Sequence, residues 1–135
     1  YRHALLGESG AAVALLEEVL GESRDADIRF EGGGLLSNIH AANRRFEDSL
    51  RILEEILPLR DHIQDLEIRH RGLLNAGVVY NQVGEYRLGR QLAQAVLDSP
   101  PEPRNTCAAE NLVAEAALGL EEDLDEARLR AIEMM

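Results

Sequence analysis

The sequence has 135 residues, a length that suits one domain able to bury about two-thirds of its unfolded surface. Its 25 acidic and 14 basic residues give a formal net charge of −11, which disfavours nucleic acid and anionic membranes as partners. No stretch reaches the roughly 18 consecutive apolar residues of a membrane span, and the single cysteine, Cys107, excludes an internal disulfide; both fit a cytoplasmic protein.

The residue usage favours helices and suggests a source. Apolar residues make up 45% and aromatic residues 4%, so the core must consist of Leu, Val, Ile and Ala, which suits closely packed helices better than a β-sandwich. All basic residues are arginine, a bias typical of GC-rich bacterial genomes. The chain begins with Tyr1 rather than methionine and ends within a predicted helix, so we expect a piece of a longer protein.

Helical periodicity runs through the whole sequence between capping residues, glycines and prolines. The segments expected in chain order are Tyr1–Leu6, a helix capped by Ser9, one that starts after Ser23 or Asp25 and reaches Ala42, Phe46 to Leu57, Asp61 to Gln82, Glu85 to Asp98, Pro103 to Ala117, and one capped by Asp123. Pro58 is expected to end the fourth segment, and Asp61 with Gln64 resembles a capping box for the fifth. The sequence therefore predicts an all-α domain of seven to eight helices.

The most specific stretch is LLNAGVVYNQVGEYRLGRQLAQAVLDSPP, residues 73–101. Small residues stand at Ala76, Gly77, Gly89 and Ala93, and large ones at Tyr80 and Tyr86. Small residues allow two antiparallel helices to cross closely, and large ones fill the space left beside the crossing. In this order of sizes the stretch resembles a tetratricopeptide repeat, and a hairpin of that kind needs similar neighbours to bury its apolar face.

The residue expected at the helix crossing recurs along the chain. It falls at Ala12, Ser49, Gly89 and Ala127, at intervals of 37, 40 and 38 residues. The commonest tetratricopeptide repeat has about 34 residues, so we expect the surplus in longer first helices, such as residues 64–70. The resulting repeat units are roughly 1–22, 25–58, 62–100 and 103–135, within one domain.

The resemblance implies a right-handed superhelix of stacked helix hairpins that holds a protein or peptide segment in a groove lined by the first helices. Asparagine suits such a groove because its amide offers a donor and an acceptor to a bound backbone. Carried onto this sequence, the groove residues are Asn38, Ala41, Arg71, Asn75, Val78 and Asn81. The long repeats are similar to sensor segments of bacterial signalling proteins, such as diguanylate-cyclase-linked and maltose-activator-like regulators. We therefore expect a sensory or regulatory binding module without a catalytic site, cofactor or metal.

Three alternatives remain open. In the first, the asparagines are exposed polar residues of a helix face or form hydrogen bonds with a neighbouring turn. In the second, the repeats form a homodimer or a spacer without a groove ligand, since apolar residues stand near the termini at Leu5, Leu6, Ile132 and Met134. In the third, the chain is a helical enzyme, which would have a deep pocket with paired carboxylates.

Three smaller features also carry expectations. The run Gly32–Gly34 indicates a close helix crossing or a kink, or else room for a ligand beside the groove. His62 and His70 lack the i, i+4 spacing of a helical metal site, so we expect surface or interface histidines. Cys107 lies beside two alanines and is expected to be a small packing residue.

Overall fold

The computed structural model describes residues 2–99 and 102–134, with side chains from Gly10 onward. All regular structure in the described part is helical, and none of it is β-strand, as the composition predicted. The elements are α1 (Arg2–Glu22), α2 (Ala26–Ala42), α3 (Phe46–Ile56), the 3₁₀ helix η1 (Leu57–His62), α4 (Leu66–Gln82), α5 (Tyr86–Asp98) and α6 (Pro103–Glu133).

Two predicted helix breaks are absent, so the described residues form six α-helices rather than seven or eight. Helix α1 runs through Ser9, and α6 runs through Asp123 without interruption. A serine or aspartate caps a helix only where the preceding chain leaves helical geometry. Neither position follows a proline or a residue with positive φ, and the Glu and Leu residues around Asp123 favour continuation there.

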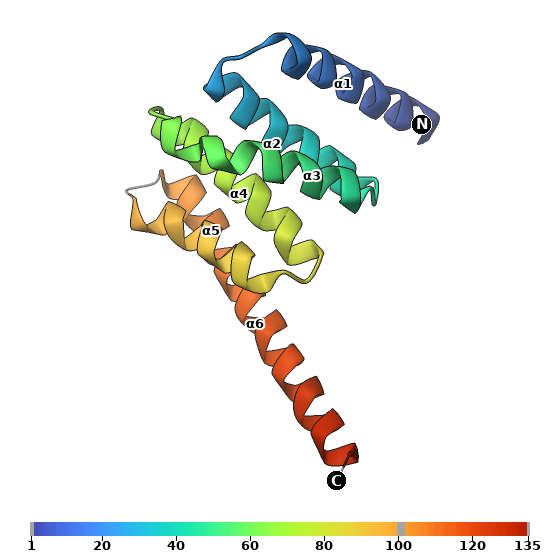
Figure 1. The fold of residues 1–135 in the computed structure, drawn as a ribbon, viewed down its shortest axis with the longest axis vertical. Coiled ribbons are helices and arrows are strands. Elements are labelled where there is room, and N and C mark those ends of the chain that lie inside the picture. The colour runs from blue at the N-terminus through green and yellow to red at the C-terminus, as the bar shows by residue number, and fades with distance from the viewer. Residues whose placement is uncertain (1, 100–101, 135) are drawn as a thin grey trace.

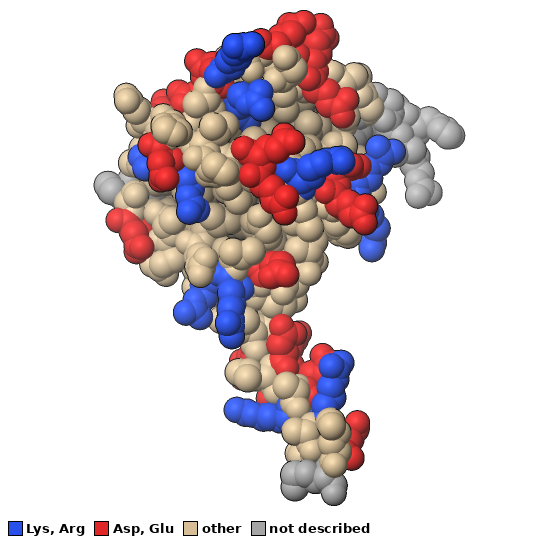
Figure 2. Space-filling view, in the orientation of Figure 1, with Lys and Arg blue, Asp and Glu red and all other residues tan. Residues whose placement is uncertain are grey.

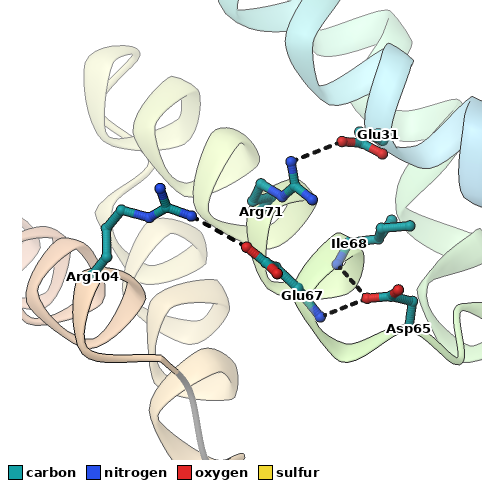
Figure 3. Close-up of polar contacts among 6 residues, drawn as sticks. All are labelled: Glu31, Asp65, Glu67, Ile68, Arg71 and Arg104. Carbon is teal, nitrogen blue, oxygen red and sulfur yellow. Dashed lines mark hydrogen bonds and ion pairs between the residues drawn. The ribbon is translucent and has the colours of Figure 1, made fainter.

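The first helix of each of two successive helix pairs begins at a capping aspartate. The Asp25 carboxylate accepts hydrogen bonds from the backbone N–H groups of Asp27 (2.9 Å) and Ile28 (3.2 Å) at the start of α2. At the start of α4, Asp65 accepts them from Glu67 (3.0 Å) and Ile68 (3.2 Å), as Figure 3 shows. The cap of α4 is therefore Asp65 and not Asp61, because the 3₁₀ helix that contains Pro58 takes up residues 57–62.

The two helix pairs also share one turn geometry. Arg44 and Gly84 are the described residues with positive φ, at 60° and 84°. After them, the N–H of Arg45 donates to His40 O and that of Glu85 to Tyr80 O, each at 2.8 Å. A hydrogen bond that closes a loop of six residues, with a left-handed residue next to last, is a Schellman motif. It satisfies backbone carbonyls at the end of a helix. The caps and the turns both recur after 40 residues.

The helices pack in a regular order (Figure 1). Helix α2 packs against α1, α3 and α4, and α4 packs against α2, α5 and α6, while α5 also packs against α6. One continuous core joins these contacts, from Phe30 on α2 to Leu112 on α6. The second half of α6 leaves this body and projects from it, with every described residue from Glu121 onward exposed.

Glycines mark the places where the helices approach most closely. A Cβ added at Gly33 would lie 2.7 Å from Ile56 Cγ2, and one at Gly72 would overlap the Phe30 ring. Beside Gly34 lies the Asn75 side chain at ordinary contact distance. The expectation of a close crossing at Gly32–Gly34 is therefore confirmed, and Ile56 and Asn75 occupy the space that a ligand would need.

Candidate binding surfaces

Asn38 ties α2 to α4. Its Nδ2 donates to the backbone oxygen of Asn75 at 3.1 Å and to that of Gly34 at 3.3 Å. The side chain is half-buried between the two helices. Its donor thus serves the packing of neighbouring helices.

Asn81 and Ala41 do not reach the open surface on which the sequence placed them. Both are 3% exposed, and the Asn81 Nδ2 donates to Leu112 O on α6 at 3.1 Å. The Asn81 amide lies against Gly89, where an added Cβ would overlap its Oδ1. The size of Gly89 therefore determines where this asparagine points, which is why the helix position alone gave the wrong surface.

Two ion pairs follow the same row of helices (Figure 3). Arg71 on α4 pairs with Glu31 on α2 at 3.0 Å, and Arg104 on α6 pairs with Glu67 on α4 at 3.2 Å. These side chains are well exposed, so water screens the pairs and each stabilises the fold by less than about 1 kcal/mol. Arg71 therefore remains able to exchange its partner for an acidic ligand.

The solvent-reaching part of the predicted groove is smaller than expected. Asn75 and Val78 are half-buried on α4, and Arg71 is exposed on the same helix. Together with Asn38 they leave a row of four residues across α2 and α4. We call these four residues, Asn38, Arg71, Asn75 and Val78, the first-helix surface.

A separate cleft of about 830 Å³ lies between α3, η1 and α5, above the side chains of α4. Its apolar lining consists of Leu57, Pro58, Leu73, Leu88, Leu92 and Ala95. Its charged lining consists of Glu54, Arg60, Asp61, Arg69 and Asp98. Apolar walls with a few polar groups are typical of binding sites, and a cleft of this volume has room for one or two large side chains.

Two buried nitrogen atoms, which belong to residues that line this cleft, lack a hydrogen-bond partner among the residues that the structure describes. They are His70 Nε2 and Arg69 Nε, both on α4. His70 is 2% exposed, and burial together with the neighbouring Arg69 charge lowers the pKa of its imidazole. Buried polar atoms without partners cost free energy, so a ligand that supplied the missing hydrogen bond would regain it.

Tyr80 adds a third polar group to the lining. It is buried near the α4 end, and burial, followed by the charges of Glu54 and Glu85, raises the pKa of its phenol. The phenol therefore stays protonated at neutral pH and keeps its O–H as a donor. Tyr80 and His70 thus add polar groups to a lining that also contains apolar side chains.

His70, expected to be a surface or interface histidine, is buried inside the chain, and the expected packing role of Cys107 was wrong. His70 occupies the position of Phe30, 40 residues earlier, and both are buried. Comparing the two positions at a 40-residue interval could have revealed the burial. Cys107 is exposed on α6, because its neighbour Ala109 takes the buried position.

Other kinds of site find little support in the described residues. Within residues 2–99 and 102–134, no group of three or more His, Cys, Asp and Glu side chains could hold a metal ion. None of the helices in that part combines the length and apolarity needed to cross a membrane. No protein-family model, curated protein or solved structure matches this chain.

Proposed function

We propose that this chain is a tetratricopeptide-like repeat scaffold that binds a protein or peptide segment, as a sensory or regulatory module of a bacterial signalling protein. The observation that carries the proposal is the 40-residue recurrence. Capping aspartates, left-handed turns and tight crossings repeat together, from Asp25, Arg44 and Ser49 to Asp65, Gly84 and Gly89. A joint recurrence of helix caps, turns and helix crossings is typical of stacked hairpins that offer an extended surface.

In this proposal the helices alternate between two roles. Helices α2, α4 and α6 are the first helices of successive repeats, and α1, α3 and α5 are second helices. The packing of α2 on α4 and of α4 on α6 supports this assignment, because first helices of neighbouring repeats contact one another in such stacks. The first-helix surface and the cleft then lie on different sides of α4, and both are candidate sites for the segment.

The cleft is the better supported of the two sites. It combines apolar walls with the unpartnered His70 Nε2, whereas the Asn38 donor on the first-helix surface is already bonded. We propose that an apolar side chain of the segment enters between Leu57, Leu88 and Ala95, and that a polar group beside it bonds His70. Because the cleft separates the second helices of two neighbouring repeats, an occupant would also alter the angle between them, which supplies a sensing mechanism.

The test begins with a random peptide library displayed on phage and selected on the purified chain. Selected peptides are then measured by fluorescence anisotropy on two variants of α5. Ala95→Arg places a long cation in the cleft and is expected to weaken binding about tenfold or more, or 1.4 kcal/mol. Gln94→Arg adds the same charge at an exposed neighbouring position outside the cleft and is expected to change affinity less than about twofold.

A third variant separates the two surfaces. The double change Asn38→Ala with Asn75→Ala removes both amides of the first-helix surface, and circular dichroism checks that helicity is retained. If this variant loses binding while Ala95→Arg does not, the first-helix surface is the site. Failure to select any peptide whose binding responds to either change would remove the scaffold proposal.

A further inference from the structure

The projecting end of α6 carries an apolar seam with the spacing of a coiled coil. From the body outward, the seam residues are Ala117, Leu120, Leu124, Ala127, Ala131 and Met134, at alternating intervals of three and four. That spacing defines the a and d positions of a heptad. Within the described residues this part of α6 packs against no other element beyond Leu120, and Leu124 is 58% exposed.

The charges beside the seam are arranged in two blocks of opposite sign. With Leu124 at position a, Glu121 and Arg128 fall at the two e positions, and Asp123 and Arg130 at the two g positions. The acidic member of each pair precedes the basic one by seven residues, and Figure 2 shows both signs on the projecting end. When a second copy of the helix runs in the opposite direction, the acidic block of each copy therefore lies beside the basic block of the other.

We propose that two copies of this chain form a dimer by antiparallel pairing of the α6 seams. In the register that places a opposite d, Leu124 of one copy faces Ala127 of the other, and Leu120 faces Ala131. The e positions then lie opposite each other and so do the g positions, which brings Glu121 to Arg128 and Asp123 to Arg130. Two-fold symmetry doubles both pairs, so four opposite-charge contacts flank the seam.

A parallel pair satisfies fewer of these charges. In parallel coiled coils a g residue meets the e residue of the next heptad, so Asp123 meets Arg128 but Glu121 and Arg130 find no partner of this kind. The small alanines opposite leucines also suit closely spaced antiparallel helices. Within one copy, Arg128 pairs with Asp125 and Arg130 with Glu126, and all four side chains are more than 60% exposed. Such exposed pairs are weak, so both arginines can pair with a second copy instead.

The seam spans 18 residues, or about 27 Å of helix, so we expect a reversible dimer with a dissociation constant on the order of micromolar. Sedimentation equilibrium of the 135-residue chain over a range of concentrations should then show monomer and dimer. Leu124→Gln, at a seam position, is expected to give a monomer. The matched change Leu129→Gln lies at an f position with similar exposure, 62%, and should leave the dimer intact.

Charge reversal gives a stricter test. Arg128→Glu with Arg130→Glu, and separately Glu121→Arg with Asp123→Arg, should each give monomers because like charges then face each other. An equimolar mixture of the two variants should restore a dimer, since all four contacts become attractive again. A wild-type chain that stays monomeric at several hundred micromolar, or a dimer unaffected by Leu124→Gln, would overturn the proposal.

The direction of pairing is tested with donor and acceptor dyes attached to Cys107, the one cysteine, which is exposed. In the antiparallel register the two Cys107 residues are offset along the helix axis by the length of about 37 helical residues, or about 55 Å. This distance predicts weak energy transfer. In a parallel pair they lie next to each other, and strong transfer would contradict the antiparallel seam.

Discussion

The hairpins α2–α3 and α4–α5 have the same backbone design and different chemistry at the crossing. Both begin at an aspartate cap and turn through a left-handed residue. At the crossing, the first has Ser37 and Ser49 where the second has Gly77 and Gly89. The crossing therefore requires small residues rather than glycine as such, and each hairpin meets that requirement in its own way.

The serines fit because each hydroxyl is bonded within the crossing. Ser49 Oγ donates to Ser37 O at 2.7 Å, and Ser37 Oγ donates to Gly34 O at 2.8 Å. In the second hairpin the missing side chains leave room for Asn81, whose amide reaches across to α6. The glycine crossing thus admits a hydrogen bond from Asn81 to α6, whereas Ala41 holds the corresponding position in the first hairpin.

The largest effect should come from closing that space. Gly89→Ala places a Cβ against Asn81 Oδ1 and 3.2 Å from Gly77 O, so we expect a loss of roughly 2–3 kcal/mol of stability. Urea unfolding followed by circular dichroism measures it. Gly10→Ala is the control, because nothing lies within 4 Å of its added Cβ and alanine favours helix. Equal effects at both positions would contradict the tight crossing.

The serine crossing should respond less. Ser49→Ala keeps the size class but removes the hydrogen bond to Ser37 O, which should cost about 1 kcal/mol. Ser49→Gly imitates the second hairpin and should cost about 1 kcal/mol more, because glycine weakens a helix and no asparagine fills the space. If Ser49→Gly were as stable as wild type, the two crossings would be interchangeable.

The turns differ in a similar way, with Arg44 in the first hairpin and Gly84 in the second. A non-glycine residue at φ 60° carries strain that glycine avoids, so Arg44→Gly should stabilise the chain by roughly 0.5–1 kcal/mol. Arg45, with φ −92°, is the control, and Arg45→Gly should bring no such gain. Thermal unfolding of the two variants, compared with wild type, measures the difference.

The same comparison shows what sequence can reveal. The ends of α2, α3 and α5 were predicted to within one or two residues. These ends depend on local geometry, namely the Asp25 cap and the left-handed residues Arg44 and Gly84. The breaks at Ser9 and Asp123 were wrong because a residue that can cap a helix does not by itself end the helix that precedes it.

The candidate site was less accessible to sequence reasoning than the helices were. The cleft depends on how the 3₁₀ segment after Ile56 faces α5, a relation between residues distant in sequence. The family resemblance placed Asn38 and Asn75 in one groove, and the two residues do lie in contact, but the resemblance could not tell that Asn81 turns inward over Gly89. Side-chain direction at a close crossing depends on the partner residue as much as on the residue itself.

The remaining prediction concerns His70, which takes the place of Phe30 in the second hairpin. Burial lowers the pKa of His70 below 6.5, so the unfolded chain binds this proton more readily than the folded chain does. Stability should therefore fall as pH drops through 6.5, with a slope of at most about 1.4 kcal/mol per pH unit from this group. His70→Phe makes the position like Phe30 and removes the contribution of this imidazole, leaving the slope due to the other titratable groups. Urea unfolding between pH 5 and 8 should show the two chains differing by a constant amount above about pH 7.5 and the variant gaining relative to wild type below 6.5. If the stability curves of the two chains stayed parallel over the whole pH range, the pKa of His70 would be the same in the folded and unfolded chains. The protonated imidazole would then need a partner that the described residues do not provide.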